Sequence, residues 1–264
     1  MNSPLPQIQY RSKPANVSMA DDWYEIASLN HFWIKHRFKI FDIILRKIRW
    51  QKPTPNVADI GCGCGLLQRQ LGTKYGWKVD GYDLNQAALS KSIAFDHSVV
   101  FYDINERHDD LKMKYDVIFL FDVIEHLEDE AAFLESVKFH LKSDGIIVVN
   151  VPAEQWLFSR YDEVAGHYRR YTRKSLNRII NQAGLSTIIC TYWGLAYIPL
   201  ILARKIVLSL NWRLTDYDII NSGFKPPSEI LNKLLTSIIR FDPFPNFFAG
   251  SSLMGVYRLE DNHE

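Results

Sequence analysis

The sequence predicts a doubly wound α/β fold, in which helices cover both faces of a mostly parallel sheet. Strand-like apolar runs alternate with helical patterns along most of the chain. Two of these runs, residues 115–123 and 145–151, are almost continuously apolar, as expected for strands buried on both faces. A glycine-rich turn follows the first strand of the alternation, where such sheets bind ligands. Together these features predict parallel pairing with right-handed crossovers.

The first 50 residues are expected to precede the sheet. Residues 1–20 are polar and contain prolines, which predicts a loose tail. Residues 22–48 predict a cap helix, because one apolar stripe recurs at helical spacing: Ile34, Phe38, Phe41, Leu45 and Ile48. The aromatic groups Trp23-Tyr24 and His31-Phe32-Trp33 lie beside this stripe, where they either contact a ligand or simply pack.

The remaining pattern predicts one domain over residues 1–264. Strands are expected at 57–61, 78–83, 98–104, 115–123, 145–151, 185–191 and 251–259, with helices beginning near 66 and covering 86–94, 131–141 and 173–183. Residues 57–193 and 251–259 form the expected core, after the tail and cap helix of residues 1–50. Residues 194–250 interrupt the alternation and predict a helical insertion before the last strand, with Leu231, Leu234, Leu235 and Ile238 on one side of a helix.

An apolar segment at residues 193–210 opens this insertion. Pro199, Arg204 and Lys205 interrupt it, so no helix that spans a bilayer is expected. Three interpretations remain open: core beneath the insertion, contact between copies of the chain, or a peripheral membrane contact for a lipid-like acceptor. In the last case Arg204 and Lys205 would suit anionic lipid heads.

Composition excludes some function classes. Lys and Arg number 31 against 30 Asp and Glu, a net charge of +1, which disfavours a nucleic-acid partner. Three scattered cysteines and the absence of an apolar leader at the N-terminus predict a reducing, cytoplasmic location. Cys62 and Cys64 supply only two ligands where structural zinc needs four, so no metal is expected. Cys190 is expected to be a buried strand residue.

The strongest motif is Asp-Ile-Gly-Cys-Gly-Cys-Gly at residues 59–65. Glycines at alternate positions let the backbone turn sharply and approach a ligand closely. The dinucleotide fingerprint requires a further glycine where Leu66 or Gln68 stands, so an NAD site is disfavoured. Asp59 would repel a pyrophosphate but suits a cationic part of a ligand.

Two further acids end the next predicted strands. Asp83 ends the strand after the turn, where a carboxylate can accept hydrogen bonds from a ribose diol. Asp103 ends the third strand and is placed to meet an adenine amino group. A nucleoside-bearing ligand with a cationic portion therefore fits this edge of the sheet.

These motifs resemble the class I S-adenosylmethionine-dependent methyltransferases. The resemblance rests on residues 59–65, on Asp83 in VDGYD and on YDVIFLFDVIEHLED at 115–129, and it covers roughly residues 22–185 with a matching last strand at 250–259. It implies a seven-stranded sheet with one antiparallel strand near the edge. Residues 122–126 are similar to ubiquinone-type and other small-molecule methyltransferases.

The resemblance also implies a cofactor site for S-adenosyl-L-methionine. The turn glycines would face the methionine part, Asp83 would hold the ribose, and Asp103 with Ile104 would flank the adenine. The full expected set is Asp59, Gly61, Cys62, Gly63, Gly65, Asp83, Leu84, Asp103, Ile104, Asp122 and Val123.

Two histidines are candidates for a general base, which a hydroxyl acceptor requires. His126 follows the fourth strand; the alternative is a histidine held by a backbone carbonyl at a helix start. His167 lies in GHYRRYT at residues 166–172, which resembles one subgroup of these enzymes. A loop of about twenty residues without predicted structure, beginning at Pro152, carries His167, and such loops are usually functional. The alternative role for His167 is to hold the loop together.

Tyr168, Arg169 and Arg170 are candidate substrate contacts in the same loop. The two arginines form a basic cluster with Arg173 and Lys174, and Thr172 is placed to cap the next helix. Cations oppose the dipole in a first helical turn, so an acidic partner is expected. That partner is either Asp162 and Glu163 or an acidic group on the substrate.

The sequence thus predicts an S-adenosylmethionine-dependent methyltransferase that acts on a small-molecule, sugar or lipid-linked acceptor, first at oxygen and second at nitrogen. Methyltransferases of nucleic-acid amino groups carry an Asp/Asn-Pro-Pro-aromatic motif after the fourth strand, where this chain has Asp122-Val-Ile-Glu125. The alternative is a non-catalytic protein that binds the same cofactor. The sequence leaves the oligomeric state open.

Overall fold

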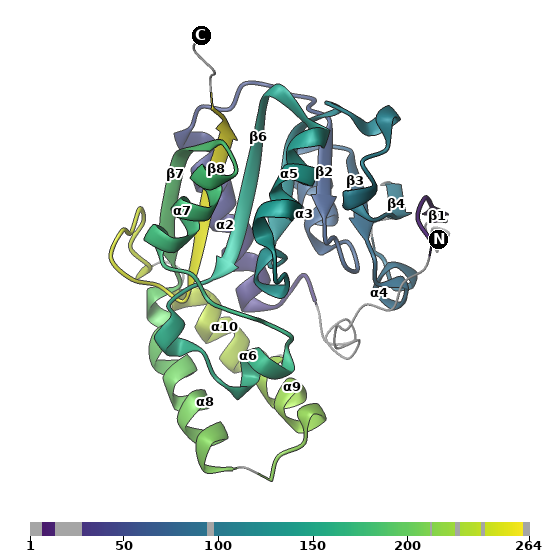
Figure 1. The fold of residues 1–264 in the computed structure, drawn as a ribbon. Helices are drawn as coiled ribbons and strands as arrows, with labels where there is room; N and C mark the ends of the chain where they lie inside the picture. The colour runs from purple at the N-terminus through teal and green to yellow at the C-terminus, as the bar shows by residue number, and fades with distance from the viewer. Residues whose placement is uncertain are drawn as a thin grey trace.

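The fold is a single eight-stranded sheet flanked by helices, seen in a computed structural model that describes residues 7–13, 28–93, 98–211, 213–224, 228–238 and 241–260. The strand order is β1-β4-β3-β2-β5-β6-β8-β7 (Figure 1). The strands are β1 (Ile8–Tyr10), β2 (Val57–Ile60), β3 (Val79–Asp83), β4 (Ser98–Phe101), β5 (Tyr115–Phe121), β6 (Leu141–Pro152), β7 (Leu185–Trp193) and β8 (Ser252–Leu259). All neighbouring pairs are parallel except those of β8, which runs antiparallel to β6 and β7. The predicted fold class is therefore confirmed, including the antiparallel strand near one edge.

The eighth strand corrects two expectations at the N-terminus. Residues 1–20 were expected to be a tail and the sheet to have seven strands, but β1 pairs in parallel with β4. Tyr10 stacks on Phe101 with ring centroids 5.7 Å apart. The strand β4 would otherwise leave its backbone groups unpaired at a sheet edge, and β1 satisfies them. Three residues are too few for a periodic pattern to reveal.

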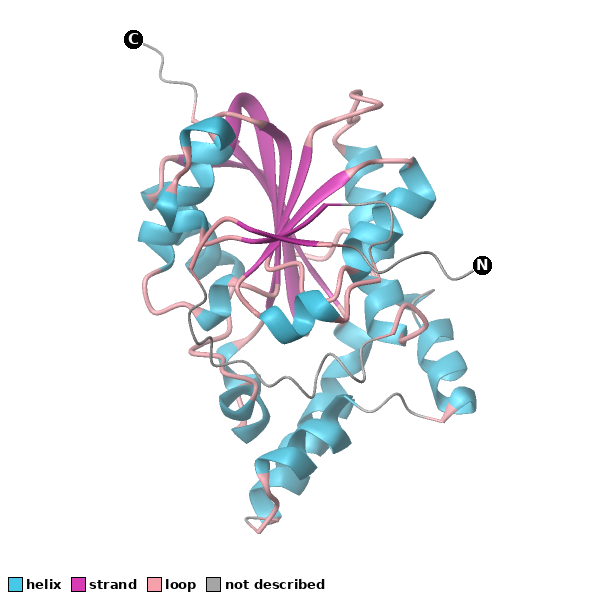
Figure 2. Ribbon diagram, turned by 90° about the vertical axis from the view of Figure 1, so that its right-hand side faces the viewer, coloured by secondary structure: helices cyan, strands magenta, loops and turns pink. Residues whose placement is uncertain are grey.

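Helices cover both faces of the sheet, as Figure 2 shows with the strands between two groups of helices. On one face α5 (Glu130–His140) and α7 (Arg173–Gln182) pack against the sheet through residues such as Leu134, Val137 and Leu176. On the other face α2 (Phe32–Lys47) and α3 (Leu66–Tyr75) contribute Phe41, Ile44 and Leu71. A short helix, α4 (Gln86–Ser90), follows β3.

The cap helix begins later than predicted. Residues 28–31 form a turn and α2 starts at Phe32, where His31 caps it by accepting a hydrogen bond from the Trp33 amide at 3.2 Å. Residues 22–27, including Trp23 and Tyr24, lie outside the described residues. The helix ends near Ile48 as expected, before the prolines at 53 and 55.

The long segment after β6 is also more ordered than predicted. It contains a 3₁₀ turn at Gln155–Leu157 and the helix α6 (Arg160–Val164). Asp162 accepts a hydrogen bond from the Ser159 amide at 2.9 Å, which closes a capping box at the start of α6. Thr172 caps α7 in the same way with Ser175, as the sequence predicted. These elements order the first part of the segment, whereas residues 165–172, which carry His167, form no helix or strand.

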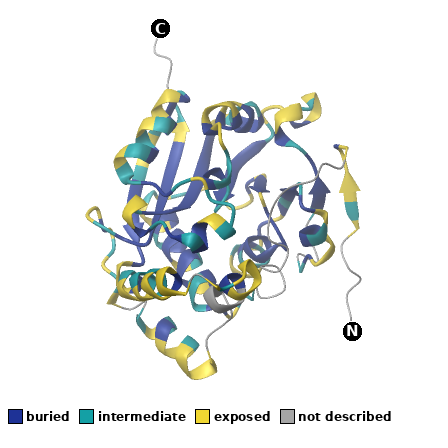
Figure 3. Ribbon diagram, turned by 60° about the horizontal axis from the view of Figure 1, so that its bottom comes forward, coloured by how far each residue is buried: buried dark blue, intermediate teal, exposed yellow. Residues whose placement is uncertain are grey.

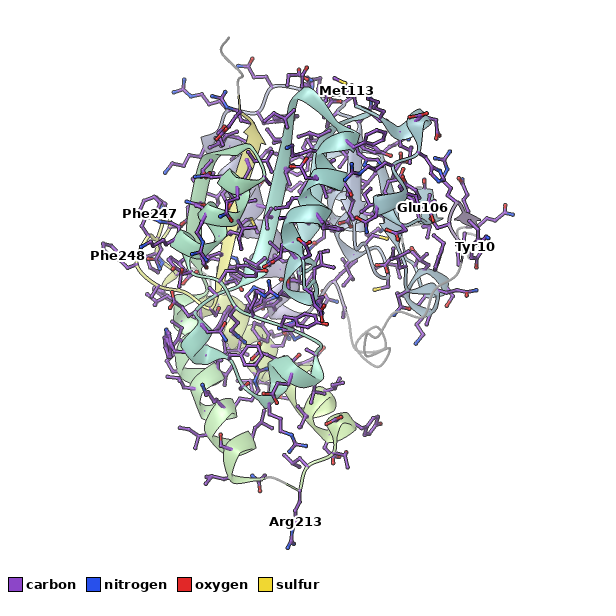
Figure 4. The ribbon with its side chains drawn as sticks, viewed as in Figure 1. Tyr10, Glu106, Met113, Arg213, Phe247 and Phe248 are labelled. Carbon is purple, nitrogen blue, oxygen red and sulfur yellow. The ribbon has the colours of Figure 1, made fainter. Side chains whose placement is uncertain are left out.

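The insertion forms three helices beyond the carboxyl ends of the parallel strands (Figure 1). They are α8 (Ile198–Leu210), α9 (Asp216–Phe224) and α10 (Glu229–Ile238). Helices α8 and α9 pack on α6, whereas α10 packs on α2. The outer surfaces of these helices are largely exposed (Figure 3), and the Arg213 side chain projects beyond the tip of the insertion (Figure 4). Within the described part of the chain, every helix is too short or too polar to cross a bilayer.

Candidate functional site

The glycine turn between β2 and α3 takes a backbone path that only glycine adopts freely. Gly61, Gly63 and Gly65 have φ values of 76°, 54° and 80°. A Cβ on Gly61 would lie 2.5 Å from the Cγ2 atom of Val123, at the end of the neighbouring strand. The amides of Gly61 and Cys62 both donate to the Tyr82 carbonyl, at 2.8 and 3.1 Å. The turn is thereby pressed against two strand ends.

Two buried carboxylates flank this turn. Asp83 accepts hydrogen bonds from the amides of Gly63 and Asn85, both at 2.7 Å. Burial raises the pKa of Asp83, although these two amide donors oppose the change. Asp59 is 2% exposed, and burial raises its pKa to about 7 while the nearby Arg37 guanidinium acts in the opposite direction. Both carboxyl groups therefore lie next to the turn, where they are negatively charged when ionised.

At the end of β5 the chain bends sharply at Asp122, whose φ is 58°. Its carboxylate accepts a hydrogen bond from the Asn150 amide group at 2.7 Å and forms an ion pair with Arg37. Arg37 lies on the buried side of α2, so this contact ties the cap helix to the strand end. Because Asp59 also lies near Arg37, one cation serves two carboxylates.

Three titratable side chains gather beyond this bend: Glu125, His126 and His167. Their ligand atoms lie within 4.8 Å of one another, and the two imidazole rings meet edge to face at 4.7 Å. Glu125 is fully buried, and both its carboxylate oxygens lack a hydrogen-bond partner among the described residues. A carboxylate with two imidazoles is also a donor set that a divalent metal ion accepts.

Each histidine is oriented by a partner at Nδ1. In His126 this atom lies 3.1 Å from the Gly166 carbonyl, and burial with the neighbouring His167 lowers the pKa of His126 to about 4. In His167 it lies 3.1 Å from the Asp162 carboxylate. A protonated Nδ1 fits both contacts and leaves each Nε2 free to accept a proton. The sequence offered the alternative that a backbone carbonyl holds His126, and the structure shows this contact.

The arginines of the loop have acidic partners within the protein. Arg170 is buried and forms a 2.7 Å ion pair with Asp162, the acid that the sequence offered as a partner for Arg173 and Lys174. Burial opposes ionisation of Asp162, but the hydrogen bond with His167 and the charge of Arg170 outweigh it and lower the pKa to about 2. Arg169 pairs with Glu130, and Tyr168 is 52% exposed. Arg173 lies over the Phe247 ring at 5.1 Å.

A cavity of about 1060 Å³ connects these groups. Of the predicted site residues, Asp59, Gly61, Cys62, Gly63, Asp122, His126, His167 and Arg170 line it. Others lie outside its lining: Gly65, Asp83, Leu84, Asp103, Ile104, Val123, Tyr168 and Arg169. His31, Phe32 and Trp33 form part of the wall, and Phe32 and Trp33 also pack against Tyr197 and Trp193, so this aromatic group fits both the ligand-facing and the packing interpretation.

Several lining residues were not identified from the sequence. Glu125 lies in the strand-end segment 122–126, where the sequence by itself indicates no role for it. Arg37 carried a usable signal, because it occupies the apolar stripe of a helix, where a charged residue is buried only with a partner. Tyr161 and Arg204 line the cavity from elements far apart in the sequence, with the Arg204 guanidinium 3.8 Å from the Tyr161 ring centre. No local pattern links that pair.

Comparison with known proteins identifies the family. A family profile described as a methyltransferase domain matches residues 32–189, more than half of the chain. The chain belongs to this methyltransferase family. The predicted resemblance to class I S-adenosylmethionine-dependent methyltransferases is therefore confirmed. The insertion at 194–250 lies beyond the matched residues.

Curated relatives are similar over part of their length. A ubiquinone biosynthesis O-methyltransferase from Bradyrhizobium diazoefficiens is 32% identical over 104 residues, which are 38% of this chain and 41% of that protein. One from Rhodopseudomonas palustris is 33% identical over 102 residues, 37% and 40% of the respective chains. The chain therefore matches only about two fifths of the length of these relatives.

Solved structures share the fold at low identity. The PH0226 protein from Pyrococcus horikoshii has a TM-score of 0.57 at 13% identity and covers 90% of this chain and 99% of its own. A putative sarcosine dimethylglycine methyltransferase from Galdieria sulphuraria has a TM-score of 0.56 at 13% identity, covering 86% and 85%. At these identities the similarity concerns the fold alone.

Proposed function

We propose that this chain binds S-adenosylmethionine at the glycine turn and transfers its methyl group to an oxygen of a small acceptor held near His126 and His167. The observation that carries the proposal is the single cavity that joins the glycine turn to the histidine pair. A methyl donor on the turn and an acceptor beside the histidines would meet inside it.

The charges of the cavity fit a cationic cofactor. Three carboxyl groups line it at the strand ends, from Asp59, Asp122 and Glu125, and a fourth, from Asp218, lines it in the insertion. Arg37 pairs with Asp122 and lies near Asp59. S-adenosylmethionine, when bound, supplies a methyl group already activated on a positively charged sulfur. We assign the turn and strand-end residues to it as the sequence predicted, with Asp83 at the ribose and Asp103 and Ile104 beside the adenine. The substrate-contact roles of Tyr168, Arg169 and Arg170 remain predictions.

His167 is the better placed general base. Its Nδ1 faces the buried Asp162 carboxylate, which stabilises a positive charge on the ring when Nε2 takes a proton. His126 has its pKa lowered to about 4 and so stays neutral at pH 7, when it can orient a hydroxyl by hydrogen bonding. A base positioned in this way contributes typically ~10²–10⁴-fold to the rate.

The experiment replaces His167 with Ala and measures transfer of labelled methyl groups to a panel of hydroxyl-bearing acceptors. We expect the turnover rate to fall about 100-fold or more, with unchanged affinity for S-adenosylhomocysteine by calorimetry. The matched control is His108→Ala, because His108 lies outside the cavity lining. Full activity of His167→Ala would remove the base, and failure to bind any adenosyl compound would refute the whole proposal.

A chelator distinguishes the base from a metal site. If His167 acts as a base, treatment with a chelator leaves turnover unchanged. If activity is lost on chelation and restored by a divalent ion, the trio of Glu125, His126 and His167 holds a metal instead.

A further inference from the structure

We propose that the three helices of the insertion hold the apolar chain of an amphiphilic acceptor, whose polar end reaches Glu125, His126 and His167. This inference rests on the proposed function, because it takes the histidine pair as the acceptor end of the site. It adds the substrate class: a hydroxyl-bearing head group on a lipid-like tail.

The cavity changes character along its length. Its inner part, at the strand ends, is lined by carboxyl, imidazole and guanidinium groups such as Asp59, Glu125 and His167. Its outer part lies among α8, α9 and α10, where the lining is mainly aliphatic: Leu200, Ile201, Ala203, Val207, Leu208, Leu214, Ile220, Leu231 and Leu235. Polar groups here are few, namely Arg204, Asn211 and Asp218. A ligand polar at one end and apolar along the rest matches this gradient.

The glycine turn and the insertion helices line different parts of one cavity. Its volume of about 1060 Å³ lies just above the ~300–1,000 Å³ typical of a pocket for one drug-sized ligand. A cofactor on the glycine turn would leave the part between the insertion helices for the acceptor. The cavity is continuous with the candidate catalytic groups, so a tail lying there would belong to the same molecule as the reacting head.

The exposed fractions of the lining residues point the same way. Val207 and Leu231 line the cavity, yet they are 52% and 44% exposed. An apolar tail would remove these side chains from water, which is the driving force expected for its binding.

An apolar tail fits better than the other acceptors considered from the sequence. A sugar presents hydroxyl groups along its whole length and needs hydrogen-bond partners there, whereas the outer lining is mainly aliphatic. A second copy of the chain would cover an outer face, whereas these residues line a recess that leads to the sheet. The recess therefore favours a narrow flexible occupant.

The probes for the test are 4-n-alkylphenols from propyl to nonyl, which carry one hydroxyl and a tail of variable length. Their dissociation constants are measured by calorimetry on the full chain, with S-adenosylhomocysteine present. We expect binding to tighten with each methylene, by about four-fold at full burial. A constant affinity across the series would overturn the proposal.

Two pairs of variants locate the tail. Val207→Gln and Leu231→Gln should flatten the dependence on chain length, because both residues line the cavity. The controls Ile206→Gln and Leu234→Gln lie on the same two helices, are each 59% exposed and lie outside the lining, so they should keep the dependence. Equal effects in both members of a pair would contradict the assignment.

The outcomes separate this inference from the proposed function. Loss of S-adenosylhomocysteine binding with a retained chain-length dependence would refute the methyltransferase proposal and leave an apolar-chain site. Retained cofactor binding without chain-length dependence would refute only the lipid tail. Ultracentrifugation tests whether a second copy of the chain fills the recess instead. A dimer that dissociates only in the variants of the lining residues would mean that it does, which would contradict the proposal.

Discussion

Glu125 shows how an unfavourable residue can mark a functional site. Its side chain is fully buried and both oxygens lack partners among the described residues, a state that costs free energy of folding. Burial, followed by the nearby Asp122 charge, raises the pKa of Glu125 well above its usual value. Proteins retain such groups mainly where a ligand supplies the missing partner.

Replacing Glu125 with Gln removes the buried carboxyl group. A carboxyl group with a raised folded-state pKa favours folding most at low pH, and this contribution is lost as the pH rises above the unfolded value of ~4.3. The variant should therefore be more stable than the natural protein, and by a larger margin at pH 8 than at pH 5. Chemical denaturation at the two pH values measures the margin.

Glu163→Gln is the control, because Glu163 is an exposed acid on α6. It should show no such trend with pH. A margin for Glu125→Gln that shrinks as the pH rises would mean that the buried carboxyl is ionised and well satisfied.

Asp83 is the second residue with a testable role. Hydrogen bonds to charged groups contribute roughly 1.5–3 kcal/mol each, so Asp83→Ala should weaken S-adenosylhomocysteine binding about ten-fold or more. Calorimetry measures the change. Asp80→Ala on the same strand is the control, since Asp80 pairs with Lys114 instead. Unchanged affinity in Asp83→Ala would refute the ribose assignment.

At the scale of elements, the turn between β2 and α3 depends on glycine for two different reasons. A left-handed φ strains any other residue, and at Gly61 a Cβ would also collide with Val123. Gly76 ends α3 with a φ of 69° and has no atom within 4 Å of where its Cβ would lie. A substitution at Gly76 therefore measures backbone strain alone, whereas one at Gly61 measures strain together with crowding.

We therefore expect Gly76→Ala to cost ~1 kcal/mol of stability and Gly61→Ala more, about 2–4 kcal/mol. Chemical denaturation gives both values. Gly61→Ala should in addition weaken S-adenosylhomocysteine binding, whereas Gly76→Ala should leave it unchanged. Equal losses of stability would mean that Val123 moves aside without cost.

Family membership does not account for the structure of the insertion, residues 194–250. The family profile ends at residue 189, before α8 begins. The insertion exposes many large apolar side chains, among them Leu210 and Ile230, and beyond its helices Phe247 and Phe248 point outward (Figure 4). Within α8 only Leu208 is buried, so a pure core role for residues 193–210 does not account for this helix.

At the scale of the whole molecule, ligand binding and folding are linked. A ligand that binds only the folded chain stabilises it by ~2.7 kcal/mol at 100 times its dissociation constant. For a domain of this size that is a rise in Tm of roughly 5–10 °C. We expect this shift with S-adenosylhomocysteine in a thermal melt and none with NAD at the same concentration.

The reverse pattern in that melt would support an oxidoreductase and exclude the methyltransferase proposal. No shift with either compound would leave the glycine turn without an adenosyl ligand. The measurement requires no knowledge of the acceptor, so it precedes every other test.

Much of the fold followed from the sequence, because the signals involved are local. Strands buried on both faces need apolar runs, and a turn with three left-handed residues needs glycine. The sequence therefore predicted the strand and turn at 57–65 and the strand at 115–121. The acidic partner expected for Arg173 and Lys174 is a different case: Asp162 pairs with Arg170 instead, and Arg173 lies over the Phe247 ring.

What only the tertiary structure decided is which distant groups meet. Arg37, Glu125 and Arg204 come from the cap helix, a strand end and the insertion, yet they line one cavity with His167. The edge strand β1 likewise forms only because β4 offers it backbone partners. Local patterns report the backbone and the burial of each segment, whereas a site depends on contacts between segments, and the packing of helices on strand ends sets those contacts.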